Sequence, residues 1–226
     1  MKPSSSDATR FGQPVLLLLL ASLLAGLGYP FVEEGFSHFQ QVVAKGAGVG
    51  LLAVAAFALP RRDRVWLGVI MSAGALGDIL LELPGLFFVG AGAFALGHVI
   101  AILFYLRNRR DSAGAVDRLA ALALIGWGLV MPTLVSPPGT PVGALMLYSV
   151  LLCGMAAALL LSRFSRLAVA GALLFVVSDT LLIMRLGGNL VGGEWLHGLL
   201  VWFSYYLGQL AIFVGVAAGL PPREPR

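Results

Sequence analysis

The chain has 226 residues, of which 59% are hydrophobic and only 12% are charged, and its mean hydropathy is +0.93. A soluble domain of this size cannot cover so much apolar surface with polar groups, so the composition indicates an integral membrane protein. The net charge is +4, and the sequence has no arginine-rich or aromatic segment of the kind that binds nucleic acids. This argues against a nucleic-acid partner and favours contact with the anionic headgroups of membrane lipids.

Eight apolar stretches are long enough to cross a hydrocarbon core of about 30 Å at about 1.5 Å per residue. The predicted helices are 14–31, 39–59, 65–83, 86–106, 119–136, 141–161, 164–185 and 197–219. The alternation of period two that is typical of a membrane barrel does not occur in these stretches. We therefore expect an all-α fold, a polytopic membrane helix bundle that forms a single transmembrane domain over residues 1–226.

Lysine and arginine collect in every second connection between these stretches. Thirteen of the 15 basic residues share one end of the predicted helices: Lys2, Arg10, Arg61, Arg62, Arg64, Arg107, Arg109, Arg110, Arg118, Arg163, Arg166, Arg223 and Arg226. The opposite end carries Glu33, Glu34, Glu82 and Glu194. The positive-inside rule then predicts that both termini lie in the cytoplasm, and the alternation favours a first helix over a cleaved signal peptide. The short loops favour the cell membrane of a bacterium, its inner membrane, as the location.

Two aspartates lie inside apolar stretches, Asp78 in GALGDILLEL and Asp179 in LLFVVSDTLL. A carboxylate in hydrocarbon is costly, so such residues usually face a bundle interior and mark a functional site. Lys45 is the expected counter-ion for one aspartate, and a pair that only fixes packing is an equally good interpretation of that contact. The second carboxyl then lacks a full counter-charge and can stay protonated near neutral pH, which describes a general acid beside a general base.

Five further polar side chains lie at similar depth in the predicted helices: His98, Ser178, Tyr205, Tyr206 and Gln209. We expect Ser178 to orient Asp179 through a hydrogen bond. Taken alone, His98 reads more simply as a hydrogen-bonded core histidine, and the tyrosines as packing or interfacial aromatics. Their shared depth with the two aspartates favours a functional polar layer.

Two reaction classes find little support in the sequence. The three histidines, His38, His98 and His197, form neither an H-x-x-x-H nor an H-E-x-x-H pair, so we expect no metal cofactor. The motif G-x-S-x-G of serine hydrolases does not occur. No other cofactor is indicated.

Five short motifs follow one another on the predicted helices: a lysine on the second, GDILL, GAFALGH, LLFVVSD and YYLGQL. In this order they resemble the YhhN-like lysoplasmalogenase family of membrane proteins. The sequence departs from the family at Lys45, which is followed by Gly46 where the family usually has proline. The resemblance implies that Lys45, Asp78, His98, Asp179, Tyr206 and Gln209 form the polar core.

The activity implied by the resemblance is hydrolysis of the vinyl ether bond of lysoplasmalogens. The products are a fatty aldehyde and glycerophosphoethanolamine or glycerophosphocholine, and the substrate partner is a lysophospholipid. In our hypothesis Asp78 and Asp179 form a carboxyl pair in which either one is the acid. Lys45 would bind the phosphate or hold one carboxylate ionised, and the remaining polar residues would position water and substrate. A transporter or proton-coupled carrier, or a lipid-binding protein without catalysis, are the alternatives.

Overall fold

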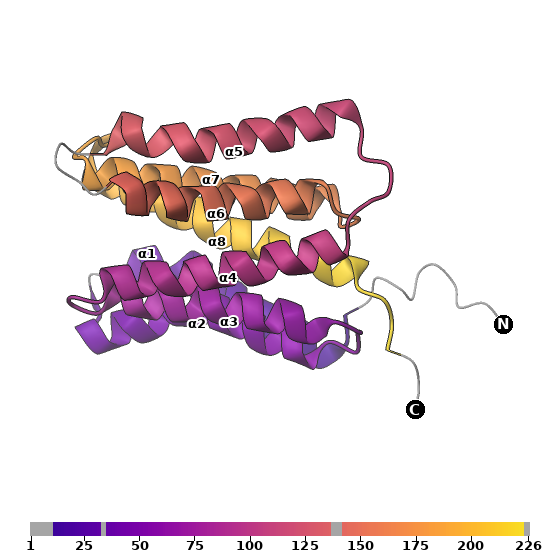
Figure 1. Ribbon diagram of the computed structural model, residues 1–226. Coiled ribbons are helices and arrows are strands. Elements are labelled where there is room, and N and C mark those ends of the chain that lie inside the picture. The colour runs from indigo at the N-terminus through magenta and orange to yellow at the C-terminus, as the bar shows by residue number, and fades with distance from the viewer. Residues whose placement is uncertain (1–10, 33–34, 137–141, 224–226) are drawn as a thin grey trace. The chain divides into compact units, whose positions relative to one another are not determined.

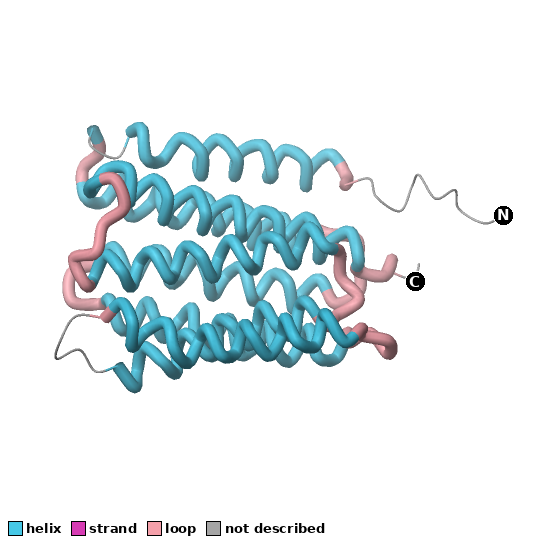
Figure 2. The backbone as a smooth tube through the Cα atoms, turned by 90° about the horizontal axis from the view of Figure 1, so that it is seen from above, coloured by secondary structure: helices cyan, strands magenta, loops and turns pink. Residues whose placement is uncertain are grey.

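A computed structural model of the chain describes residues 11–32, 35–136 and 142–223. Within these residues the structure has eight helices and no strand (Figure 2): α1 Gln13–Val32, α2 His38–Ala58, α3 Arg64–Glu82, α4 Phe87–Arg107, α5 Ala115–Val135, α6 Val142–Leu160, α7 Arg166–Leu186 and α8 Gly193–Gly219. Each of the eight is long and apolar enough to cross a membrane. The predicted all-α fold with eight membrane-length helices is confirmed.

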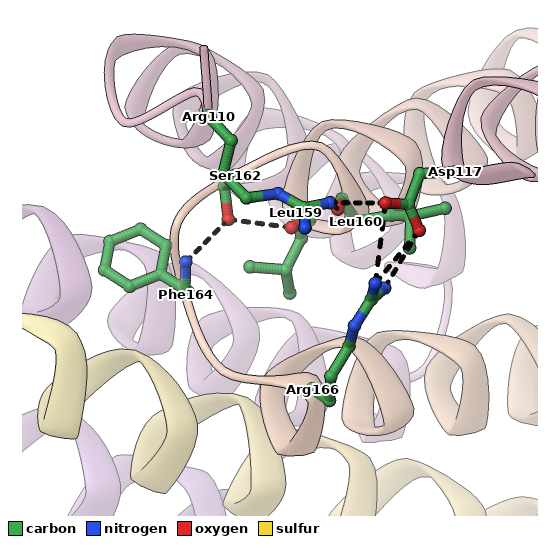
Figure 3. Close-up of polar contacts among 7 residues, drawn as sticks. All are labelled: Arg110, Asp117, Leu159, Leu160, Ser162, Phe164 and Arg166. Carbon is green, nitrogen blue, oxygen red and sulfur yellow. Dashed lines mark hydrogen bonds and ion pairs between the residues drawn. The ribbon is translucent and has the colours of Figure 1, made fainter. Parts of the chain in front are cut away.

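Helices α5 and α8 each begin four residues earlier than the sequence predicts. At α5 the reason is an ion-pair cluster, because Asp117 in the first turn binds Arg110 at 2.9 Å and Arg166 at 3.1 Å. Figure 3 shows both guanidinium groups pointing at this carboxylate. An acidic residue is favourable in the first turn of a helix. The helix therefore includes charged residues that a prediction from hydropathy leaves outside it.

The chain divides into two compact units. Unit 1 comprises Met1–Gly97 together with Phe213–Arg226, and unit 2 comprises His98–Ile212. The divisions fall inside α4 and inside α8, so both helices contribute residues to both units. The single transmembrane domain over residues 1–226 stays a prediction.

In unit 1, α2 packs against both α1 and α3 (Figure 1). Small residues make these contacts close: the Ser22 hydroxyl of α1 donates to the Gly48 carbonyl of α2 at 2.6 Å. A Cβ atom at Gly46 of α2 would lie 2.6 Å from a side-chain carbon of Ile79 on α3. Such contacts are typical of membrane helices, where small residues let the backbones approach.

In unit 2, α5, α6 and α7 pack against one another, and α7 meets α8 at a pair of glycines. A Cβ atom at Gly171 would lie 2.5 Å from the Gly208 carbonyl oxygen, and one at Gly208 would lie 2.7 Å from the Gly171 carbonyl oxygen. The two backbones therefore touch directly. This contact places the polar residues of α7 and α8 on neighbouring helices.

Connections that carry arginine lie together within each unit. In unit 1 the amide of Arg62 donates to the Pro221 carbonyl at 3.0 Å, which joins the α2–α3 connection to the segment after α8. In unit 2 the amide of Arg163 donates to the Asn108 carbonyl at 2.9 Å, which joins the α6–α7 and α4–α5 connections. Both pairings fit the predicted alternation of charge, and the cytoplasmic placement of the two termini stays a prediction.

Some of the charges used in that argument lie outside the described residues. These are Lys2, Arg10, Glu33, Glu34 and Arg226.

Candidate functional site

Asp78 lies on the buried face of α3 in unit 1. Its exposed fraction is 2%, and the buried residues of the helix recur at helical spacing as Leu67, Met71, Gly74, Ala75 and Asp78. Glycine and alanine in this stripe leave room for neighbouring backbones, so the carboxyl lies deep in packed protein. The prediction that Asp78 faces the protein interior is confirmed.

Lys45 of α2 binds Glu82 and corrects the expectation that it pairs with an aspartate. The Nζ of Lys45 lies 2.5 Å from Oε2 of Glu82, the last residue of α3, and the two side chains are 23% and 20% exposed. A lysine side chain is long enough to carry its ammonium group toward the end of a membrane helix. Its partner is therefore a carboxylate at the helix end.

Asp179 of α7 is buried in unit 2, with an exposed fraction of 6%. The phenol of Tyr148 on α6 donates a hydrogen bond to Oδ2 of Asp179 at 2.5 Å. The neighbouring Ser178, which the sequence predicts as the orienting partner, instead donates its hydroxyl to the Val201 carbonyl of α8 at 2.8 Å. Tyr148 thus has the role expected for Ser178, and Ser178 joins α7 to α8.

His98 lies beside the Tyr148 and Asp179 pair. Its ring is 4% exposed and makes edge contacts with the rings of Tyr148, at 5.7 Å between centroids, and Phe175, at 5.3 Å. In the part of the chain that the structure describes, Nε2 of His98 is buried and has no hydrogen-bond partner. A buried polar atom of this kind is costly unless a water molecule or a ligand satisfies it, so His98 remains a candidate for binding either.

The polar residues of α8 continue this cluster through aromatic contacts. Phe175 contacts the ring of Tyr205 at 5.2 Å, and Gln209 donates its amide to the Tyr205 hydroxyl at 3.5 Å. Tyr206 is fully buried and stacks on Trp202, with 6.3 Å between ring centroids. Of the eight residues predicted for the site, unit 2 contains six and unit 1 contains Lys45 and Asp78.

Sequence reasoning missed Tyr148, although a signal for it existed. Tyr148 lies six residues after the first residue of α6, and Asp179 lies seven residues before the last residue of α7. Because the two helices are consecutive and antiparallel, these counts place both residues at the same depth. A search that included uncharged phenols at that depth would have found the pair.

His197, for which the sequence predicts no role, makes two hydrogen-bond contacts with the backbone. It is fully buried at the start of α8, where Nδ1 accepts from the Val191 amide at 3.1 Å and Nε2 lies 2.9 Å from the Leu181 carbonyl. Nδ1 therefore binds the α7–α8 connection through Val191, and Nε2 contacts the backbone of α7 at Leu181. His197 therefore fixes this connection.

Across residues 11–32, 35–136 and 142–223, no three histidine, cysteine, aspartate or glutamate side chains form a group that could hold a metal ion. The chemistry available in unit 2 is that of a buried carboxyl, a phenol and an imidazole. These groups can donate, accept and transfer protons at neutral pH. The pairing of Asp179 with Asp78, which belongs to unit 1, stays a prediction.

Comparison with known proteins gives one family match. The model of the YhhN family matches residues 40–216, from α2 to α8, and so includes every candidate residue from Lys45 to Gln209. Neither a curated protein nor a solved structure matches the chain.

Proposed function

This chain belongs to the YhhN family, and on that premise we propose that it is an integral membrane hydrolase that cleaves the vinyl ether bond of lysoplasmalogens. The products are a fatty aldehyde and glycerophosphoethanolamine or glycerophosphocholine. Support comes from the family match over most of the chain, from the eight membrane-length helices, and from buried proton-transfer groups inside them. The substrate is itself a membrane lipid, so it can reach such groups without leaving the bilayer.

The reaction requires an acid and a water molecule and no nucleophilic serine. A proton is added to the β-carbon of the vinyl ether, which leaves an oxocarbenium ion on the neighbouring carbon and oxygen. Water adds to that carbon and loses a proton to a base, and the resulting hemiacetal collapses to aldehyde and alcohol. One water molecule is consumed, and the acid and base are restored, as in glycoside hydrolysis by a carboxyl pair.

Asp179 is the acid in this proposal, and the observation that carries it is the hydrogen bond from Tyr148 to a carboxyl that is 94% buried (6% exposed). The bonded partner is a neutral phenol, so the contact orients the carboxyl without the fixed positive charge that would hold it ionised. Asp78 is the proposed second carboxylate, which stabilises the oxocarbenium ion or accepts the proton of water. Its burial inside α3 supports this role.

The remaining site residues have proposed roles in binding. The ammonium group of Lys45 has three N–H donors, so it can bind a substrate phosphate while it remains paired with Glu82. The unsatisfied Nε2 of His98 is suited to the attacking water or to a substrate oxygen. Tyr205, Tyr206 and Gln209 would line the path of the substrate. We further propose that the protein lies in the cell membrane, a bacterial inner membrane, with both termini on the cytoplasmic side.

The test is release of fatty aldehyde from lysoplasmenylethanolamine by purified protein in detergent, followed by mass spectrometry. The matched control substrate is the saturated alkyl ether lysolipid with the same headgroup, which has no double bond to protonate. Run in deuterium oxide, the reaction should place one deuterium on the carbon next to the aldehyde, and aldehyde incubated alone corrects for exchange. Aldehyde that appears without deuterium would contradict protonation of the β-carbon.

The same assay separates this proposal from a carrier, since detergent-solubilised protein has no gradient across a membrane. A folded protein that binds the lysolipid and releases no aldehyde would favour a transporter or a lipid-binding protein. Thermal melting in the same detergent shows whether the sample is folded.

A further inference from the structure

We infer that Tyr148 is a positioning residue for Asp179, which it holds so that Oδ1 presents the reacting proton. This inference rests on the proposed function, in which Asp179 is the acid. The phenol is half-buried on α6 and reaches α7 to donate to Oδ2 of Asp179 at 2.5 Å. Tyr148 has no place in the family motifs on which the site was predicted.

A carboxyl has two oxygens, and a proton is delivered well only if one of them is held in a fixed direction. The hydrogen bond to Oδ2 restrains rotation of the Asp179 carboxyl about its terminal torsion, which is otherwise broad. With Oδ2 occupied as acceptor, the proton resides on Oδ1. Tyr148 thereby determines which oxygen faces the substrate.

The segment that carries Tyr148 is closely packed against α5. A Cβ atom at Gly128 of α5 would lie 2.8 Å from the Ser149 carbonyl oxygen and 3.1 Å from the Cα atom of Val150, so α5 packs directly on this backbone. The Tyr148 ring also makes an edge contact with the ring of His98, with 5.7 Å between the centroids. A residue locked by its neighbours in this way can fix the geometry of the group it binds.

The chain also offers a matched control, Tyr105 of α4. Tyr105 is fully buried in unit 2, and within the described residues its hydroxyl has no hydrogen-bond partner. Tyr105→Phe removes the same oxygen atom from the same residue type without breaking a bond. Any effect of Tyr148→Phe that Tyr105→Phe lacks is therefore an effect of the contact with Asp179.

The experiment is infrared spectroscopy of the detergent-solubilised full chain over a range of pH, with aldehyde release measured on the same samples. The carbonyl-stretch band of protonated Asp179 is identified by its loss in Asp179→Asn. We expect Tyr148→Phe to move this band to higher frequency, because a hydrogen bond donated to a carbonyl lowers its stretching frequency. Tyr105→Phe should leave the band in place, and difluorotyrosine at position 148, a stronger donor, should move it the other way.

In the turnover assay Tyr148→Phe should lower kcat by about 10- to 100-fold and change KM little, since geometry at the reacting atom is lost and substrate binding is kept. An unmoved band in Tyr148→Phe, or a spectrum in which Asp179→Asn removes no band at any pH, would overturn the inference. So would equal losses of kcat in Tyr148→Phe and Tyr105→Phe. If Tyr148→Phe shifts the band and the wild-type protein releases no aldehyde, the contact is upheld and the proposed function alone is contradicted.

Discussion

Tyr148 and Asp179 are joined by a hydrogen bond of 2.5 Å between the phenol oxygen and Oδ2, from α6 to α7. Membrane burial leaves such a carboxyl few ways to be satisfied, and a neutral donor satisfies it without removing its capacity to carry a proton. The contact explains how an aspartate is kept inside α7. It also means that a substitution by asparagine can remove the transferable proton of position 179 and still leave an acceptor for the Tyr148 hydroxyl.

Asp179→Asn should abolish turnover and leave the fold intact. The asparagine side chain keeps an acceptor oxygen for Tyr148, and it cannot transfer the proton. General acid catalysis contributes about 10²- to 10⁴-fold, so the rate of aldehyde release should fall by at least about 100-fold. Initial rates and thermal melts of the same samples check this.

The control for Asp179→Asn is Asp111→Asn, the same chemical change at an exposed position in the α4–α5 connection. Its rate should equal that of wild type. If Asp179→Asn retains turnover within a few-fold of wild type, Asp179 is not the acid.

The ion pair of Lys45 and Glu82 should stabilise unit 1. Glu82→Gln leaves a partly buried ammonium group without its counter-charge, so the free energy of unfolding should fall by about 1–2 kcal/mol. Lys45→Met should cost a similar amount. The double variant Glu82→Gln/Lys45→Met removes both charges, so its loss in the free energy of unfolding should be smaller than the sum of the two single losses. Denaturation of wild type, the two single variants and the double variant gives the coupling energy. An additive double variant would mean that Lys45 has its main partner elsewhere.

Position in the sequence predicts depth in the membrane and not direction around a helix. The two aspartates could be predicted as buried because each lies in a long apolar run, and Asp78 and Asp179 are 2% and 6% exposed. The partner of Lys45 could not be predicted in this way, because the long, flexible side chain of Lys45 reaches toward the end of α3, where Glu82 lies. Tyr148 was missed because an uncharged aromatic residue does not interrupt an apolar run.

The first residues of α5 and α8 also could not be predicted from hydropathy alone. A hydropathy count ends at the first charges, and the first turn of α5 contains Asp117 and Arg118. Asp117 pairs there with Arg110 and with Arg166, and these ion pairs stabilise the turn. The start of α5 therefore depends on contacts between residues distant in the sequence, which a local hydropathy pattern does not contain.

Direct backbone contact between α7 and α8 predicts that Gly171 tolerates no side chain. In Gly171→Ala the new methyl group would lie 2.5 Å from the Gly208 carbonyl oxygen, which belongs to backbone and cannot rotate away. We expect a loss of about 1–3 kcal/mol in the free energy of unfolding. Turnover should fall too, because α7 carries Asp179 and α8 carries Tyr205.

Gly126→Ala in α5 is the matched control, because a Cβ atom there would have no neighbour within 4 Å. Alanine is the better helix former, so this variant should be as stable as wild type or more stable by up to about 1 kcal/mol. Equal melting temperatures for Gly171→Ala and wild type would show that the two helices can separate at no cost.

Asp117 should stabilise the end of unit 2 at which the α4–α5 and α6–α7 connections meet. Both terminal nitrogens of Arg166 donate to its Oδ1 at 3.1 Å, and Arg110 binds its Oδ2 at 2.9 Å (Figure 3). Asp117→Asn leaves two arginines side by side without their shared counter-charge, so the melting temperature should fall below that of Asp111→Asn. Salt screens exposed charges at separations beyond the Debye length, about 8 Å at 0.15 M ionic strength and about 3 Å at 1 M, so the difference between the two variants should shrink as salt is added. A difference that is the same at low and high salt would show that Asp117 acts through packing rather than through its charge.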